Sequence, residues 1–132
     1  MRDLHARTVF FVKNAPRSLR FYTKTLGFSL DWNHEEDGQA FVFQVNMLGF
    51  QLILNQTEDR TESRAGCGRV FVGLEPDQLE GFRRHLQGHA IESEVVSWGA
   101  PTLRICDPDG NELFFSLPVR ERESLKVGSN WP

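Results

Sequence analysis

Residues 11–28 read FVKNAPRSLRFYTKTLGF and predict, in this order, the end of a strand, a helix and the start of another strand. Asn14 is a residue type that caps helix N-termini, and Pro16 suits a first helical turn. Between positions 19 and 26 the apolar side chains recur with the spacing of one helix face. Gly27 favours the end of the helix. The stretch therefore predicts a helix that packs one face against a sheet.

The rest of the chain predicts this arrangement twice. In the first half, residues 8–12, 28–32, 40–45 and 50–54 have the composition of strands, so the order of elements is β-α-β-β-β. A polar stretch at 57–68 follows, with the composition of a linker. The second half then predicts a strand at 69–74, a helix from Pro76 to Gly88, and strands at 91–98, 102–106 and 112–117.

Two modules of this kind define the expected fold class. We expect an α+β fold of two tandem β-α-β-β-β modules, whose curved mixed sheets surround a cup. The predicted organisation is a first module at residues 1–57, a linker at 58–68, a second module at 69–118 and a C-terminal tail at 119–132. One helix cannot cover both faces of a four-stranded sheet. The bare faces must therefore pair within the chain or with a second chain, and a homodimer is the expected form.

The composition excludes several classes of protein. The chain has 132 residues, 39% hydrophobic and 25% charged, as in an ordinary globular domain. The net charge of −3 arises from mixed charges without a basic patch, so no nucleic-acid partner is expected. No apolar run is long enough to span a bilayer, and the first residues do not resemble a signal peptide. The two cysteines do not form a disulfide framework, and we expect a cytoplasmic location.

Four stretches of the sequence resemble those of a known family. They are FVKN with RSLRFY at residues 11–22, LGF at 26–28, WG at 98–99 and DPDGN at 107–111. In this combination they resemble the glyoxalase/bleomycin resistance protein/dioxygenase superfamily, also called the vicinal oxygen chelate proteins. The resemblance implies the glyoxalase/bleomycin resistance/dihydroxybiphenyl dioxygenase fold. It leaves the function open, because the superfamily includes isomerases, dioxygenases, transferases and drug-sequestering proteins.

The metal-binding positions of the superfamily hold unsuitable side chains in this chain. By resemblance they correspond to Arg7, Gln51, Arg69 and Phe114. Only the amide of Gln51 could bind a cation, since arginine stays protonated and phenylalanine has no donor atom. We therefore expect no metal and no cofactor, as in the metal-free bleomycin-resistance branch. The metal-binding alternative is a shifted site. It would use the imidazole of His5, two residues before Arg7, and the carboxylate of Glu112, two residues before Phe114.

The candidate ligand site combines cationic and aromatic side chains. Arg7 and Arg69 lie at equivalent places in the repeat and could clamp an acidic group of a ligand. The alternative is that they form internal ion pairs with Glu94, Glu112 or Asp31. Rings could stack on a flat ligand, although each could equally belong to the core. The full set of expected ligand-binding residues is Arg7, Phe11, Trp32, Gln51, Arg69, Phe71, Trp98, Arg104 and Phe114.

These observations lead to one favoured function, one enzymatic alternative and a third possibility, a subunit or scaffold that binds no ligand. The favoured function is metal-free binding of a small aromatic or hydrophobic molecule, with antibiotics among the candidates, by sequestration. The expected ligand is flat or hydrophobic and carries one acidic group. The alternative is a glyoxalase-like lyase or isomerase, of the lactoylglutathione lyase type, with a non-standard active site. Catalytic residues are not assigned under either function.

Overall fold

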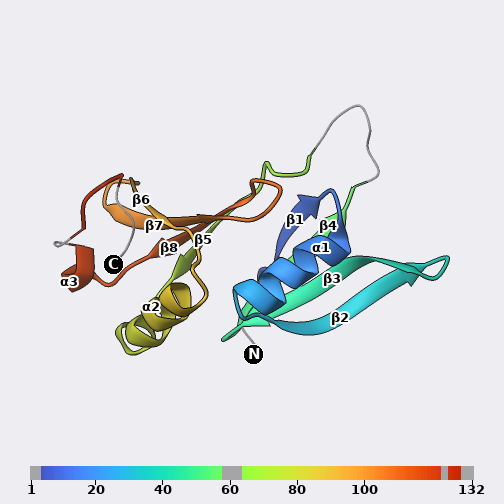
Figure 1. Cartoon of the computed structure of the whole chain (residues 1–132), viewed down its shortest axis with the longest axis horizontal. Coiled ribbons are helices and arrows are strands. Elements are labelled where there is room, and N and C mark those ends of the chain that lie inside the picture. The colour runs from blue at the N-terminus through green and yellow to red at the C-terminus, as the bar shows by residue number, and fades with distance from the viewer. Residues whose placement is uncertain (1–3, 58–63, 123–124, 129–132) are drawn as a thin grey trace.

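The computed structural model describes residues 4–57, 64–122 and 125–128 and places them in two modules (Figure 1). The first module consists of β1 (Thr8–Val12), α1 (Ala15–Arg20), the π-helical turn η1 (Phe21–Thr25), β2 (Ser29–Glu36), β3 (Gln39–Met47) and β4 (Phe50–Gln56). The second module consists of β5 (Arg69–Gly73), the short 3-10 helix η2 (Pro76–Gln78), α2 (Leu79–Gly88), β6 (Glu94–Ser97), β7 (Pro101–Cys106), β8 (Glu112–Ser116) and the short helix α3 (Val119–Arg122).

Each module contains one four-stranded mixed sheet. The strand order is β1-β4-β3-β2 in the first sheet and β5-β8-β7-β6 in the second. In both, the first strand runs parallel to the last strand of its module, and the remaining pairs are antiparallel. The predicted β-α-β-β-β order and the predicted fold class are thus confirmed. Residues 119–122, which the sequence analysis placed in a tail, form α3.

The helix of the first module begins and ends as its sequence predicts. The side chain of Asn14 accepts a hydrogen bond from the backbone N–H of Arg17 at 3.0 Å, which satisfies one of the free donors of the first turn. The helix continues through η1, and Gly27 follows with a φ of 89°. A residue with a Cβ is strained in that conformation, so the glycine allows the chain to leave the helix and enter β2.

Two strands differ in length from the prediction. Residues 35 and 36, predicted to lie in a turn, end β2, and only Asp37 and Gly38 form the turn, with φ values of 52° and 76°. Two positive φ angles match the twist of a tight hairpin, which lets both strands continue to the turn. Conversely, β6 is shorter than the predicted strand at 91–98, because the backbone N–H of Ile91 bonds to Leu86 of α2 instead of a neighbouring strand.

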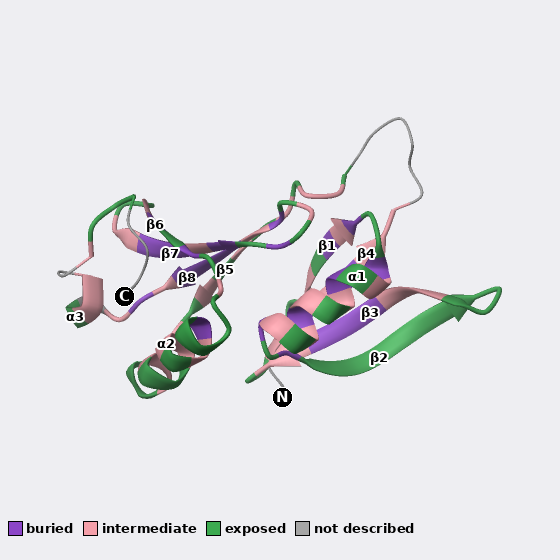
Figure 2. Cartoon of the chain, viewed as in Figure 1, coloured by how far each residue is buried: buried purple, intermediate pink, exposed green. Residues whose placement is uncertain are grey.

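The core lies on the helix-covered face of each sheet. Phe10 of β1 and Leu52 of β4 are fully buried beneath α1, and Leu103 and Leu113 are fully buried in the second sheet. Neighbouring residues alternate between the two faces of a strand, so the opposite face of each sheet carries the more exposed side chains. Figure 2 shows this contrast: buried residues follow β3, β7 and β8, whereas β2 is exposed throughout its length.

The DPDGN turn between β7 and β8 joins the two modules. Asp107 is buried, and its carboxylate accepts hydrogen bonds from the backbone N–H groups of Asp109 and Asn111. It also accepts a hydrogen bond at 3.0 Å from the hydroxyl of Tyr22, which lies in η1 of the first module. Arg17 of α1 pairs with Asp109 at 2.9 Å. Two of the stretches that carry the family resemblance therefore bind each other.

Asn111 extends this joint to β1. Its side-chain amide donates to the backbone carbonyl of Phe11 at 3.1 Å, and its oxygen accepts from the N–H of Gly68 at 2.8 Å. Asn111 is fully buried, so these partners replace the water that its amide would otherwise bind. The asparagine thus has a structural function in positioning β1 against the start of the second module.

Candidate ligand-binding site

Three predicted aromatic residues form a cluster on the open face of the second sheet, opposite α2. We call Phe71, Trp98 and Phe114 the aromatic cluster. The rings of Phe71 and Phe114 are stacked, with centroids 4.9 Å apart. The indole of Trp98 meets them edge-on, at 4.9 Å and 5.4 Å. Phe114 is buried, while Phe71 and Trp98 are each half exposed. Phe115, the next residue on β8, packs on Phe82 of α2, which places Phe114 on the opposite face.

A charge-balanced network lies beside the aromatic cluster. Glu112 receives a hydrogen bond from Arg69 at 2.7 Å and another from Arg104 at 3.0 Å. Arg104 also pairs with Glu94 at 3.4 Å. Both arginines therefore have internal carboxylate partners, and for Arg69 the partner is Glu112, one of the three carboxylates that the ion-pair alternative named. Arg69 in addition lies 5.8 Å from the ring of Trp98, so it connects the network to the cluster.

The open face of the first sheet carries a chain of polar side chains. Arg7 donates to the amide oxygen of Gln44 at 2.9 Å. The amide nitrogen of Gln44 donates to Asp31 at 2.8 Å, and Asn46 donates to the other oxygen of the same carboxylate. Within the described ranges, the guanidinium of Arg7 thus reaches a carboxylate only through a neutral amide. Among the predicted cationic residues, Arg7 differs from Arg69 and Arg104, which bind carboxylates directly.

The other predicted residues of the first module occupy the same sheet. The ring of Phe11 on β1 lies 5.4 Å from the guanidinium carbon of Arg64. Trp32 pairs with Gln44 across β2 and β3 and is 40% exposed. Gln51 lies on β4, opposite Asn46. The structure thereby gathers the predicted residues into two sets, one on each sheet: Arg7, Phe11, Trp32 and Gln51, and Arg69, Phe71, Trp98, Arg104 and Phe114.

Two participants were missed from the sequence. Gln44 is buried at the centre of β3, where it holds Arg7 and Asp31 together. The sequence did contain a sign of this role, because Gln44 is the single amide within the otherwise apolar run at 41–45. A polar side chain that is buried in such a run needs hydrogen-bond partners. Arg64 precedes β5 in the polar stretch at 57–68, and nothing in its sequence context pointed to Phe11.

The four metal-binding positions that the family implies do not fit a metal ion. Arg69 is occupied by an ion pair, and Phe114 lies in the aromatic cluster. Arg7 is a cation, so Gln51 is the one side chain of the four with a neutral oxygen. The alternative built on His5 and Glu112 does not fit better, because the Glu112 carboxylate is bound by two arginines. Over the described residues, no group of three or more His, Cys, Asp or Glu side chains could hold a metal ion.

In the part of the chain that the structure describes, two side chains have a shifted pKa. Burial, together with the neighbouring Asp107 carboxylate, raises the pKa of Tyr22 well above its ordinary value. Burial also raises the pKa of the Cys106 thiol at the end of β7, although Arg104 opposes the shift. A raised pKa keeps the thiol protonated at neutral pH, and a protonated thiol is a poor nucleophile. Neither group points to covalent chemistry at the open faces.

The comparison with protein families gives a match over most of the chain. Residues 5–115 match the family described as the Glyoxalase/Bleomycin resistance protein/Dioxygenase superfamily. A search of curated proteins gives no match. Within the ranges that the structure describes, no helix is long and apolar enough to cross a membrane.

Several solved structures resemble this chain in fold. A bleomycin-binding protein from Streptomyces verticillus, complexed with copper(II)-bleomycin, has a TM-score of 0.65 and 21% identity, and the match covers 89% of this chain and 98% of that one. An antibiotic-binding protein from Streptomyces sp. CB03234 has a TM-score of 0.65 and 20% identity, with the same coverages of 89% and 98%. A virulence protein from Salmonella typhimurium has a TM-score of 0.59 and 20% identity, covering 90% and 99%.

Proposed function

Because this chain belongs to the glyoxalase/bleomycin resistance protein/dioxygenase superfamily, we propose that it binds a small aromatic or hydrophobic molecule and sequesters it without turnover. Antibiotics are among the candidate ligands, since two of the proteins similar in fold are described as binding bleomycin and an antibiotic. The proposed site needs no metal, because its donor set does not fit one. A cytoplasmic location remains a prediction from the two free cysteines.

The observation that carries this proposal is the half-exposed aromatic cluster. About half of the surface of Phe71 and of Trp98 is exposed to solvent, whereas large aromatic side chains are usually buried in a core. Buried Phe114 supports them from below, so the rings stand in a fixed arrangement before a ligand arrives. Rigid rings offer contact area at a low entropic cost, which favours a flat or hydrophobic ligand.

The charges around the cluster refine the ligand class. Arg69 and Arg104 are neutralised by Glu112 and Glu94, so the second sheet offers little net attraction for an anion. Arg7, which binds the neutral amide of Gln44, is the better partner for the acidic group of a ligand. An acidic, flat molecule would then contact the rings of the second sheet and the guanidinium of the first.

Such a ligand requires both open faces, and a homodimer would bring them together. A second copy would place its own open face opposite the exposed apolar side chains that neither α1 nor α2 covers, among them Val9, Phe71 and Trp98, and so enclose a cup around them. Burying them between two chains is favourable, and twofold symmetry is the most common arrangement for such an assembly. We therefore propose that the binding cup lies between two chains.

Tryptophan fluorescence tests the proposed function. A panel of aromatic carboxylates, neutral aromatics and cationic glycopeptides is titrated into chelator-treated protein. We expect the aromatic acids to bind best, and Trp98→Phe to remove most of the fluorescence change. Phe71→Ala should weaken binding about tenfold, or about 1.4 kcal/mol. Phe41→Ala is the matched control, because Phe41 contacts His34 near the tip of the β2–β3 hairpin, outside the cluster.

The same protein preparation separates this proposal from the lyase alternative. We expect far less than one equivalent of zinc, nickel, iron or manganese per chain when the protein is purified without chelator. Near-stoichiometric metal that disappears in His5→Ala or Glu112→Ala would instead support a metal-dependent enzyme. If Phe71→Ala binds the whole panel as tightly as the unmodified protein, the aromatic cluster is not the site.

A further inference from the structure

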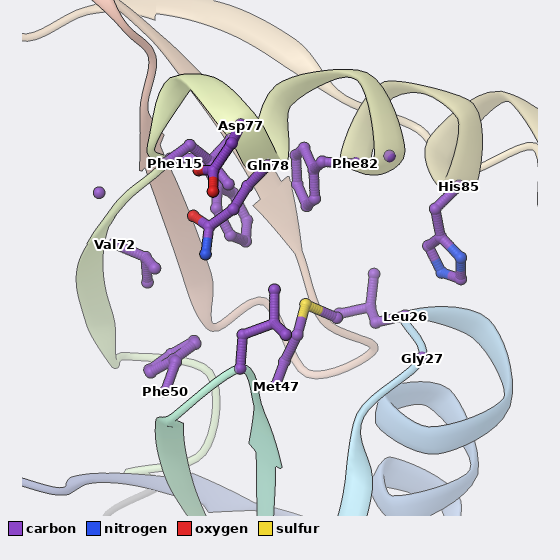
Figure 3. A pocket seen from close by; sticks show the side chains of 14 residues that line it. Leu26, Gly27, Met47, Phe50, Val72, Asp77, Gln78, Phe82, His85 and Phe115 are labelled. Carbon is purple, nitrogen blue, oxygen red and sulfur yellow. The ribbon is translucent and has the colours of Figure 1, made fainter.

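A cavity lies between the modules, on the helix side of the sheets. Its volume is about 460 Å³, within the range of small-molecule sites. One wall comes from α2 and β8, with Phe82 and Phe115, and the facing wall comes from the first module, with Leu26, Met47 and Phe50 (Figure 3). Phe114 and Phe115 are neighbours on β8 and point to opposite faces, so the second sheet separates this cavity from the aromatic cluster.

The chemistry of the lining specifies the kind of ligand. Most of the described lining side chains are apolar, and none is lysine or arginine. The one imidazole of the lining, that of His85, bonds through Nε2 to the backbone carbonyl of Thr25 at 3.0 Å. Asp77 supplies a carboxylate, and Figure 3 shows it beside Gln78, with both pointing into the cavity. The Gln78 side chain is fixed by a hydrogen bond from the backbone N–H of Glu75 at 3.0 Å. An apolar cavity with one carboxylate complements an apolar molecule that carries a positive charge.

The turn at the mouth of the cavity supplies an independent observation. Leu48 and Gly49 connect β3 to β4 with φ values of 51° and 91°. A turn with two positive φ angles favours asparagine, aspartate or glycine in its first position, so leucine is strained there. Leu48 is also 81% exposed, although it lines the cavity. An apolar side chain that is both strained and exposed at the mouth is consistent with an apolar ligand there.

We propose that this cavity is a second ligand site, which takes a small apolar amine. The apolar body of the amine packs between Phe82 and Phe115 on one side and Met47 and Phe50 on the other. Its ammonium group pairs with the Asp77 carboxylate at the rim. The proposal is independent of the site on the open faces, which favours an acid and lies on the other side of the second sheet.

Three probes with the same chain length test the charge preference. We propose to titrate n-octylamine, octan-1-ol and octanoate into the protein and to follow backbone amide signals by nuclear magnetic resonance. Gly27, Gly73 and Gly81 line the cavity, so their amides report on its occupation. We expect octylamine to shift all three and to bind about tenfold more tightly than octanoate, or about 1.4 kcal/mol. Octanoate that binds as tightly as octylamine would overturn the proposal.

Variants of α2 locate the site. A Cβ added at Gly81 meets no atom within 4 Å, so Gly81→Leu can direct its side chain into the cavity and should abolish binding of all three probes. Gly88→Leu, in the same helix and equally unobstructed, is the matched control and should bind them unchanged. Asp77→Asn should reduce octylamine affinity to that of octan-1-ol. Since an acidic residue in a first turn also stabilises the helix, its thermal stability is measured separately.

Three results would contradict the second site. Gly81→Leu could leave the probe-induced shifts intact, or octylamine could shift the amides of the aromatic cluster instead of the three cavity glycines. In either case the amine binds elsewhere. The three glycine amides could also shift with protein concentration in the absence of any probe. The cavity would then be occupied by a second copy of the chain, and the proposal of a small-molecule site would be wrong.

Discussion

Tyr22 is the only tyrosine of the chain, and its hydroxyl donates to the buried Asp107 carboxylate that joins the modules. Its pKa is raised in the folded protein, so the unfolded chain releases the phenolic proton at a lower pH than the folded one. This contribution to stability is intact below about pH 10 and is lost as the pH rises further. We expect phenolate absorbance to appear together with the loss of circular dichroism during an alkaline titration.

A tyrosine that titrates near pH 10 in protein that remains folded would contradict this account. The variant Tyr22→Phe provides a second measurement, because it removes the hydrogen bond to Asp107 and keeps the ring. We expect it to lower the free energy of unfolding by about 1.5–3 kcal/mol, the usual contribution of a hydrogen bond to a charged group. Chemical denaturation at neutral pH measures this difference.

Arg7 and Arg69 occupy equivalent places in the repeat but have different partners. Arg69 pairs with Glu112, whereas Arg7 binds the neutral amide of Gln44. Arg7→Met should therefore weaken binding of an aromatic acid about tenfold. Arg69→Met should change the affinity less than about threefold, because Glu112 already neutralises the Arg69 guanidinium and leaves little attraction for the acid. Equal losses in both variants, measured by fluorescence titration, would instead support a clamp built from both arginines.

Sequence reasoning located these side chains but could not assign their partners. Alternation along a strand places Arg7 and Arg69 on the open faces, since a two-residue period fixes the face of each residue. It does not fix the neighbouring strand's register, on which the Arg69–Glu112 pair depends. For the same reason Gln44 was missed, because its role becomes clear only when β1, β3 and β2 are assembled with Arg7 and Asp31.

The DPDGN turn shows how a sequence motif can serve the architecture rather than a reaction. The motif predicted the turn between β7 and β8, and this prediction is confirmed. Its contacts with Tyr22 and Arg17 lie about ninety residues away in the sequence, and no local pattern encodes them. The strand–helix order followed from local periodicity, whereas the relation between the modules depends on these long-range contacts.

Gly66 tests the close approach at this joint. Its φ is 85°, and a Cβ added there would lie 2.0 Å from the carbonyl oxygen of Asp109. Gly66→Ala should therefore destabilise the protein by about 2 kcal/mol or more, from backbone strain and a steric clash together. Gly38→Ala is the matched control, since Gly38 also has a positive φ but a Cβ there meets nothing within 4 Å.

The comparison between these two variants separates the cost of the steric clash at residue 66 from the backbone strain that a positive φ causes in both. Thermal unfolding of both proteins, followed by circular dichroism, provides the measurement. We expect the melting temperature of Gly66→Ala to fall clearly below that of Gly38→Ala. Similar melting temperatures would mean that residue 66 does not approach the turn at residues 107–111 as closely as the structure has it.

The two open faces set an expectation for the whole assembly. Each carries exposed apolar side chains, including Val9 and Trp32 on the first sheet and Phe71 and Trp98 on the second. Light scattering should therefore give a mass of about twice 15.2 kDa, as for a symmetric dimer. Replacing Trp98 and Phe71 together by serine should shift the mass toward that of one chain. A monomer at micromolar concentration in the unmodified protein would contradict a cup shared by two chains.

Equilibrium dialysis followed by mass spectrometry of both compartments can establish whether the protein sequesters its ligand. Chelator-treated protein is placed on one side and the best-binding aromatic acid of the panel on both. Sequestration predicts that the acid accumulates beside the protein up to about one equivalent per chain, in line with one aromatic cluster in each copy. The total amount of unchanged acid should remain constant. A falling total with a new product, or no accumulation at all, would contradict sequestration.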